Sequence, residues 1–270
     1  MCYEFNLVII IAYIREARAI FDLNRFEEIK DAPFITFREH KILVIICGQG
    51  RLRAAAAVSF AKTLCEYKLI FWLNIGAAGH RNLSIGTVVQ AGKIYDLETD
   101  RSWFPSTPFK KNIAAVEINT CDIPIENYPK DVCYDMEASG FIELAQIDSI
   151  PEQLAVVKVI TDNHSNPFRH QSINELEMSM RKKKNTVTTL VADYMAQAAV
   201  IADSIKPIIL PWWLRTIKFT ATQRNEVKHL INNYRVQSKE QRLPFLKISK
   251  TASTRDVLNQ LRQVWSGGNT

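Results

Sequence analysis

Short, continuous apolar runs rich in β-branched residues recur along the first two-thirds of this chain. The clearest lie at 7–12 (LVIIIA), 40–46 (HKILVII), 69–74 (LIFWLN) and 155–161 (AVVKVIT). A strand that is apolar at consecutive positions, and not only at alternate ones, has to be covered on both faces. Such strands are typical of parallel sheets that lie between two layers of helices.

Helix-forming sequence separates these runs, as a parallel sheet requires. The expected helices lie at 52–64, where four alanines stand in a row, within 132–145, which carries Asp135-Met136-Glu137-Ala138 into a helix, and at 188–205. A further short strand is expected at 86–91. The alternation predicts an α/β fold with helices on both faces of one sheet.

Chemically capable residues follow several of the predicted strands. They are Glu16 after 7–12, Gly48-Gln49-Gly50-Arg51 after 40–46, a glycine turn at 75–79 after 69–74, Glu137 at a strand-to-helix junction, and Asp162 after 155–161. Each alone is typical of an ordinary turn, helix cap or first-turn carboxylate. Ligands of open α/β sheets bind beyond the carboxyl ends of the strands, so together these residues predict one site at that edge.

Composition excludes several classes of protein. The chain is 47% hydrophobic and 23% charged, as in globular proteins, and no apolar run approaches the roughly 18 residues of a membrane span. The run at 7–14 has neither a basic leader nor a small-residue cleavage site, and it is interpreted as a buried strand and not as a signal peptide. Five cysteines without CxxC spacing, and scattered histidines, predict no disulfide framework, no metal site and a reducing, cytoplasmic location.

The charge distribution predicts two parts. Residues 207–270 hold 11 Lys and Arg against 3 Asp and Glu, whereas residues 1–206 are nearly neutral. Pro207 and Pro211 end the preceding helix, and 221–234 and 253–265 have helical spacing. The cluster Pro211-Trp212-Trp213-Leu214 is expected to dock this basic helical extension. Its basic faces are either simply solvated or bind an acidic partner, with nucleic acid the less favoured reading.

The order and spacing of the motifs resemble the nucleoside phosphorylase and nucleosidase superfamily, especially its methylthioadenosine/S-adenosylhomocysteine nucleosidase branch. The matching stretches, between residues 5 and about 205, are LVIIIAYIRE, ICGQGRLRAAAA, LNIGAAGHRNLSIGTVV, DMEASGFIELA and VVKVITD. The resemblance implies a three-layer α/β/α sandwich, a homodimer or higher homo-oligomer, a small nucleoside as ligand, and no cofactor.

The resemblance also implies a reaction, the cleavage of the N-ribosyl bond of a purine nucleoside. Such a reaction needs an acid for the departing base and groups that hold the sugar while positive charge develops on it. By resemblance Asp162 is that acid, Glu16 positions or activates the water, and Glu137 accepts hydrogen bonds from the ribose hydroxyls. The remaining substrate-binding positions implied are Met136, Lys158, Thr161, Gly48, Ala77 and Gly79.

The chain departs from the family at several points. Ala77 and Thr161 stand where serines are usual, and Lys158 replaces an arginine, which keeps the charge but loses the planar fork. The segment before Asp135 is short, which leaves Trp103, Phe104 and Phe109 as candidates to stack on the base.

No arginine except Arg51 or Arg53 is in a place to hold phosphate, so hydrolysis is favoured and phosphate is a co-substrate only if the enzyme is a phosphorylase. The alternative is a catalytically degenerate protein of the same fold, a nucleoside sensor or partner-binding protein.

Overall fold

A computed structural model describes residues 5–65, 69–109, 113–170, 172–204, 214, 217–238 and 253–265. The chain divides into two compact units, Met1–Ser204 and Ile205–Thr270, which are described separately. Within the described ranges, no helix is both long and apolar enough to cross a membrane.

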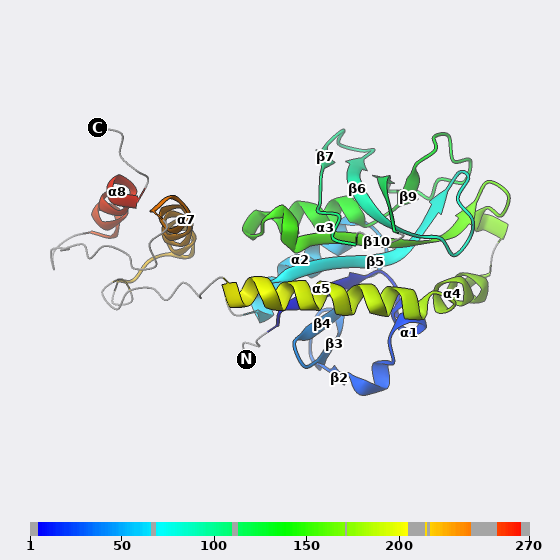
Figure 1. The fold of residues 1–270 in the computed structure, drawn as a ribbon, viewed down its shortest axis with the longest axis horizontal. Coiled ribbons are helices and arrows are strands. Elements are labelled where there is room, and N and C mark those ends of the chain that lie inside the picture. The colour runs from blue at the N-terminus through cyan, green and yellow to red at the C-terminus, as the bar shows by residue number, and fades with distance from the viewer. Residues whose placement is uncertain are drawn as a thin grey trace. The chain divides into compact units, whose positions relative to one another are not determined.

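The first unit is built on one mixed sheet (Figure 1). Its strands are β1 (Leu7–Ile11), β2 (Glu27–Glu28), β3 (Ile35–Glu39), β4 (Ile42–Ile46), β5 (Phe71–His80), β6 (Val88–Asp96), β7 (Ser102–Trp103), β8 (Ala114–Thr120), β9 (Cys133–Asp135) and β10 (Leu154–Asn163). Its helices are α1 (Ile14–Ile20), α2 (Arg51–Leu64), α3 (Ala138–Ala145), α4 (Ile173–Arg181) and α5 (Lys184–Ser204).

The strand order is β10-β6-β8-β9-β5-β1-β4-β3-β2, and β10 also pairs with β5. One part of the sheet is therefore a closed ring of paired strands, in the order β5, β9, β8, β6 and β10. The other part is an open sheet that extends from β5 through β1, β4, β3 and β2. Strands β4, β1, β5 and β10 run parallel to one another. Their carboxyl ends consequently share one edge.

Two hydrophobic layers enclose the sheet, because successive side chains of a strand point to opposite faces. In β1, Val8 and Ile10 pack in the same core cluster as α2 and α3. Leu7, Ile9 and Ile11 pack in a second cluster with α1, α4 and α5. All five side chains are fully buried, which explains the unbroken apolar run. The expected α/β fold, with helices on both faces and helices at the carboxyl terminus, is confirmed.

The glycine-rich segment 75–79 differs from expectation, since it lies inside β5 and forms no turn. Strand β10 pairs with β5 along its whole length, and this pairing keeps the small residues extended. Strand β10 likewise continues through Asp162 to Asn163, with a register shift between Ile160 and Asp162. Helix α5 begins four residues earlier than expected, at Lys184.

Helices α2 and α3 meet at Gly140. A Cβ atom at Gly140 would overlap the backbone carbonyl of Arg51, in the first turn of α2. We therefore expect Gly140→Ala to lower the free energy of unfolding by about 3 kcal/mol, the upper part of the usual range for overpacking. Urea denaturation measures this change in the free energy of unfolding. Gly92→Ala is the control, because a Cβ at Gly92 would lie 3.4 Å from the Ala115 side chain, and a change within about 1 kcal/mol is expected there. Equal stability of the two variants would contradict the close crossing.

The second unit contains α7 (Ala221–Ser238) and α8 (Thr254–Trp265). They share a core cluster of their own, made of Leu214, Phe219, Val227, Leu230, Ile231, Val257, Leu258 and Leu261. Ser253 caps α8 through Asp256, and Arg262 of α8 pairs with Glu226 of α7 at 2.5 Å. The predicted docking residues Trp212 and Trp213 lie outside the described residues.

Candidate active site

Glu16 lies in the first turn of α1, directly after β1, and connects that turn to β5. One carboxylate oxygen accepts the backbone N–H of Tyr13 and the other accepts the backbone N–H of Ala77, both at 2.9 Å. Burial raises the pKa of Glu16, against these hydrogen bonds and the charge of Lys158. Ala77 thus contacts the site through its backbone, which any residue type would provide.

Glu137 stands at the amino-terminal end of α3 and faces the glycine turn after β4. Its Oε1 accepts the backbone N–H of Gly50 at 2.8 Å. Gly48 and Gly50 adopt φ values of +81° and +104°, a region that favours glycine, and this geometry turns the Gly50 N–H toward the carboxylate. Burial raises the pKa of Glu137 to about 7, with a further rise from Asp135 and an opposing effect of Lys158.

Lys158 lies in β10 with its side chain fully buried, and it compensates the charge of the neighbouring acids. Its Nζ is 2.6 Å from Oδ2 of Asp135. Burial lowers the pKa of Lys158, but Asp135, Glu137 and Glu16 together outweigh that effect and raise it. Apart from the ion pair, the ammonium has no hydrogen-bond acceptor among the described residues.

Asp135 organises this cluster, although the sequence did not single it out as a site residue. It accepts hydrogen bonds from the backbone N–H groups of Glu137 and Ala138 and from the Thr120 hydroxyl. These contacts cap α3 and place Glu137. Its position next to Met136 and Glu137 is the signal that could have identified it.

The raised pKa of Glu137 predicts a pH dependence of stability. Between pH 4.5 and about 7 the folded protein holds a proton at Glu137 that the unfolded chain has released. This contribution to stability is therefore complete below pH 4.5 and is lost as the pH rises through 7.

The substitution Glu137→Gln removes this titration. We expect wild type to lose on the order of 2 kcal/mol more stability than Glu137→Gln between pH 5 and pH 8, in urea denaturation at both values. The control is Glu117→Gln in the half-exposed pair with Lys93, which should follow wild type. Parallel pH profiles of wild type and Glu137→Gln would contradict the assignment.

Asp162 occupies the end of β10, where both of its oxygens have partners. The Thr161 hydroxyl donates to Oδ1 at 2.8 Å, and the Tyr128 hydroxyl donates to Oδ2. Burial raises the pKa of Asp162, against these two hydrogen bonds. A Cβ at Gly79 would overlap the Asp162 carboxylate and come within 2.6 Å of the Tyr128 ring, so glycine is required there.

The cluster around Lys158 and the carboxylate of Asp162 lie along the same stretch of β5. In the parallel pairing, Lys158 is opposite Gly76 and Asp162 is opposite Gly79, while Glu16 bonds to Ala77. Three strand residues span about 10 Å, which is close to the length of a nucleoside. The structure thus brings Glu16, Glu137 and Lys158 into one cluster and places Asp162 farther along the same edge.

Met136 belongs to a chain of side chains beside this cluster. The Gln49 amide donates to its sulfur at 2.8 Å, and the Tyr13 hydroxyl donates to the Gln49 carbonyl at 2.6 Å. Tyr13 is half exposed, so this chain leads from the buried acids to solvent.

Other residues considered from the sequence are used elsewhere in the structure. Arg51 pairs with Asp122 at 2.8 Å and with Asp96 at 3.7 Å. Phe109 packs on Tyr194 in the core cluster that includes α5. Trp103 is buried beneath the Arg101 guanidinium, and Phe104 is 68% exposed.

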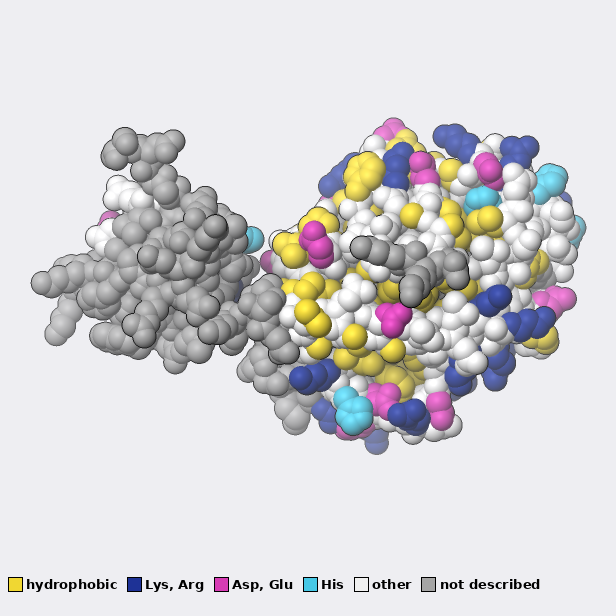
Figure 2. Space-filling view, in the orientation of Figure 1, with side chains coloured by type: hydrophobic (Ala, Val, Ile, Leu, Met, Phe, Trp, Pro, Cys, Tyr) yellow, Lys and Arg dark blue, Asp and Glu magenta, His cyan; other side chains and the backbone are white. Residues whose placement is uncertain are grey.

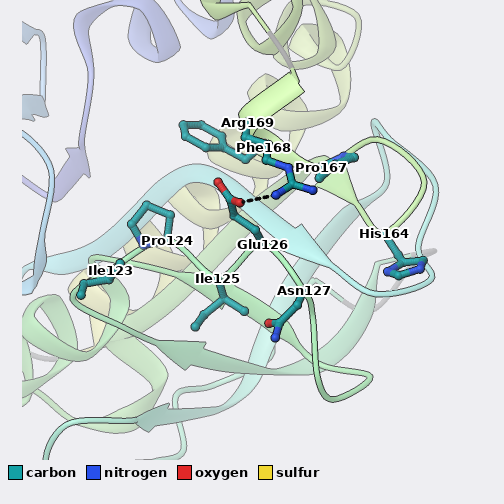
Figure 3. A pocket seen from close by; sticks show the side chains of 9 residues that line it. All are labelled: Ile123, Pro124, Ile125, Glu126, Asn127, His164, Pro167, Phe168 and Arg169. Atoms are coloured by element: carbon teal, nitrogen blue, oxygen red, sulfur yellow. Dashed lines mark hydrogen bonds and ion pairs between the residues drawn. The ribbon is translucent and has the colours of Figure 1, made fainter.

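A hollow of about 690 Å³ opens near Asp162, between residues 123–127 and residues 164–169 (Figure 3). The Glu126 carboxylate and the Arg169 guanidinium approach to 3.4 Å across it. The first wall leads into Tyr128 and the second follows Asp162. Its volume lies in the range of small-molecule sites. Tyr128 had no signal in the sequence, because it is one of eight tyrosines and lies 34 residues from Asp162.

Comparison with known proteins finds the fold in nucleosidase structures. The chain is similar to 5′-methylthioadenosine nucleosidase of Arabidopsis thaliana, with 16% identity, a TM-score of 0.61, and coverage of 70% of this chain and 96% of that one. The chain is also similar to a 5′-methylthioadenosine/S-adenosylhomocysteine nucleosidase of Helicobacter pylori bound to butyl-thio-DADMe-Immucillin-A. The identity is 16%, the TM-score is 0.56, and the match covers 71% of this chain and 99% of that one. For the futalosine hydrolase of Helicobacter pylori the identity is 14% and the TM-score is 0.55, with coverage of 72% of this chain and 98% of that one. No protein family matches the sequence, and no curated protein matches it. The chain has the nucleosidase fold.

Proposed function

We propose that this protein hydrolyses the N-ribosyl bond of a purine nucleoside of the adenosine type, with or without a 5′ substituent. The observation that supports this most is the row of buried acids, Glu16, Glu137 and Asp162, along one edge of a sheet with the nucleosidase fold. Buried carboxylates are costly to maintain, so an aligned set of them is typical of a functional site.

Each acid can perform one part of the reaction. Asp162, whose pKa is raised by burial, donates a proton to the departing purine, because an unprotonated purine anion leaves poorly. Glu137 accepts hydrogen bonds from the ribose hydroxyls. The hydrogen bond from the Gly50 N–H to Oε1 orients its carboxylate for this role. Glu16 orients a water toward the anomeric carbon, and Lys158, with unsatisfied N–H groups, holds that water or a sugar oxygen.

Hydrolysis is favoured over phosphorolysis by the charge of the site. Three carboxylates, those of Asp135, Glu137 and Glu16, surround a single lysine, and Arg51 is already paired with Asp96 and Asp122. A phosphate dianion would meet net negative charge here, whereas a neutral water would not.

The deciding experiment supplies the purified full chain with adenosine, inosine, 5′-methylthioadenosine or S-adenosylhomocysteine, with and without phosphate. Free base is separated by chromatography. We expect base release that does not depend on phosphate and is greatest for an adenine nucleoside. Release only in the presence of phosphate would establish phosphorolysis, and no release from any nucleoside would overturn the enzyme assignment.

The second candidate is a nucleoside sensor without turnover, and the Tyr128 hydrogen bond favours it. The acid Asp162 is occupied by a residue of its own chain, as expected of a site that no longer donates a proton. Nucleoside binding by calorimetry without base release would support the sensor.

We also propose a cytoplasmic homodimer or higher homo-oligomer. The buried free thiols of Cys47, Cys121 and Cys133 suit a reducing compartment, and the assembly rests on the family resemblance. Lys and Arg alternate with Asp and Glu on the face of the first unit shown in Figure 2, which gives no reason to favour nucleic acid there.

A further inference from the structure

Each oxygen of the Asp162 carboxyl group already accepts one hydrogen bond. Thr161 donates to one oxygen and Tyr128 donates to the other. An acid that protonates a ring nitrogen needs one oxygen directed at that nitrogen. Thr161 is the adjacent residue of β10, whereas Tyr128 belongs to the separate segment between β8 and β9. Tyr128 is therefore the partner that can leave.

Tyr128 is held in an unfavourable backbone conformation. Its φ is +43°, in the left-handed region that bulky residues rarely adopt. The side chain is nevertheless fully buried, with the Tyr134 ring at 6.2 Å and the hydroxyl bonded to Asp162. The surroundings thus hold Tyr128 against its own preference, and such conformations concentrate at sites that switch.

The segment that carries Tyr128 faces its neighbour across a hollow. It forms one wall of the 690 Å³ hollow, and residues 164–169 form the other, as Figure 3 shows. The ion pair between Glu126 and Arg169 joins the two walls, but its side chains are 40% and 61% exposed. Exposed ion pairs contribute little to stability, so this one does not lock the hollow.

We propose that Tyr128 is a gate on the acid: its hydroxyl occupies the place of the purine on Asp162, and a purine that enters the hollow displaces it. The inference rests on the proposed function, which makes Asp162 the acid. It adds a specificity requirement, because the incoming base has to replace the hydrogen bond that the phenol gives up.

The gate couples base binding to protonation. The hydrogen bond from Tyr128 lowers the pKa of Asp162, against the effect of burial. When the phenol leaves, burial acts with less opposition, and the pKa of Asp162 rises further. Displacement of the phenol therefore favours the protonated form of the acid.

Tyr128→Phe tests the gate, since it keeps the ring against Gly79 and removes only the hydroxyl. With adenine as the probe, calorimetry on the full chain should show about 3- to 10-fold tighter binding than in wild type, the usual worth of one competing hydrogen bond. The matched control is Tyr134→Phe, whose hydroxyl accepts the backbone N–H of Lys130 and does not contact Asp162. Its affinity for adenine should equal that of wild type.

A second measurement uses the unaltered sequence. In protein labelled with 3-fluorotyrosine, the fluorine resonance that disappears in Tyr128→Phe should shift on addition of adenine and stay in place on addition of ribose. Equal or weaker adenine binding by Tyr128→Phe, no adenine binding by either protein, or an unmoved resonance at saturating adenine would overturn the gate. Tighter adenine binding by Tyr128→Phe without turnover of any nucleoside by wild type would reject the hydrolase and retain the gate.

Discussion

Replacing Asp162 with asparagine should reduce the release of base about 10²- to 10⁴-fold, the usual loss when an acid catalyst is removed. The amide has nearly the shape of the carboxyl and can still meet the Thr161 and Tyr128 hydroxyls, but it has no proton to deliver. We expect the dissociation constant of the nucleoside to change far less than the rate. Single-turnover chromatography gives the rate, and calorimetry gives the affinity.

Asp131→Asn is the control for this prediction, because it makes the same chemical change at an aspartate whose side chain is 65% exposed. Asp131 bonds to the Asn82 amide and lies 3.6 Å from Nδ1 of His80. Its replacement should leave the rate unchanged. A rate for Asp162→Asn equal to that of Asp131→Asn would show that Asp162 is not the acid.

Replacing Lys158 with methionine should cost about 3–5 kcal/mol of folding stability, as breaking a fully buried ion pair usually does. Methionine fills much of the same volume, so the loss comes from Asp135, Glu16 and Glu137, which keep their burial and lose their common cation. Urea denaturation followed by circular dichroism measures the difference.

Lys93→Met provides the comparison, since Lys93 also pairs with a carboxylate, Glu117, at 3.1 Å, but with about a third of each side chain exposed. Such pairs contribute roughly 0–1 kcal/mol. If the two substitutions cost the same, the buried acids are not held by Lys158, and its role would be limited to ligand contact.

The fold was predictable where the sequence had to satisfy burial on two sides. Strands β1 and β4 lie between two core clusters, so nearly every position is apolar and the pattern is unambiguous. Strands β3 (ITFRE) and β8 (AAVEINT) have polar or half-buried positions, and their residue patterns do not clearly predict a strand. The glycines of β5 are extended because β10 pairs with them. This pairing cannot be predicted from the residues at 75–79 alone, because β10 lies far away in the sequence.

The candidate site was predictable to the same degree. Glu16, Glu137 and Asp162 could be named because each follows a recognisable strand, and their roles remain predictions. Tyr128 could not be named, because its contact with Asp162 joins the loop between β8 and β9 to the end of β10, 34 residues away in the sequence. Residues that reach a site only through tertiary contacts produce no periodic pattern in the sequence.

The register shift in β10 makes the location of the acid depend on chain length. Between Ile160 and Asp162 the strand holds one residue more than β5 opposite it, so Thr161 is the extra residue of a bulge. If the same residues paired without this shift, Thr161 would lie opposite Gly79 and Asp162 opposite His80, with its side chain on the other side of the sheet, because strand side chains alternate. An insertion or deletion of one codon in this strand is therefore not equivalent to one in a surface loop. In alignments of related chains, a gap at Thr161 leaves the aspartate opposite Gly79, whereas a gap elsewhere between Lys158 and Asp162 requires the acid to be assigned anew.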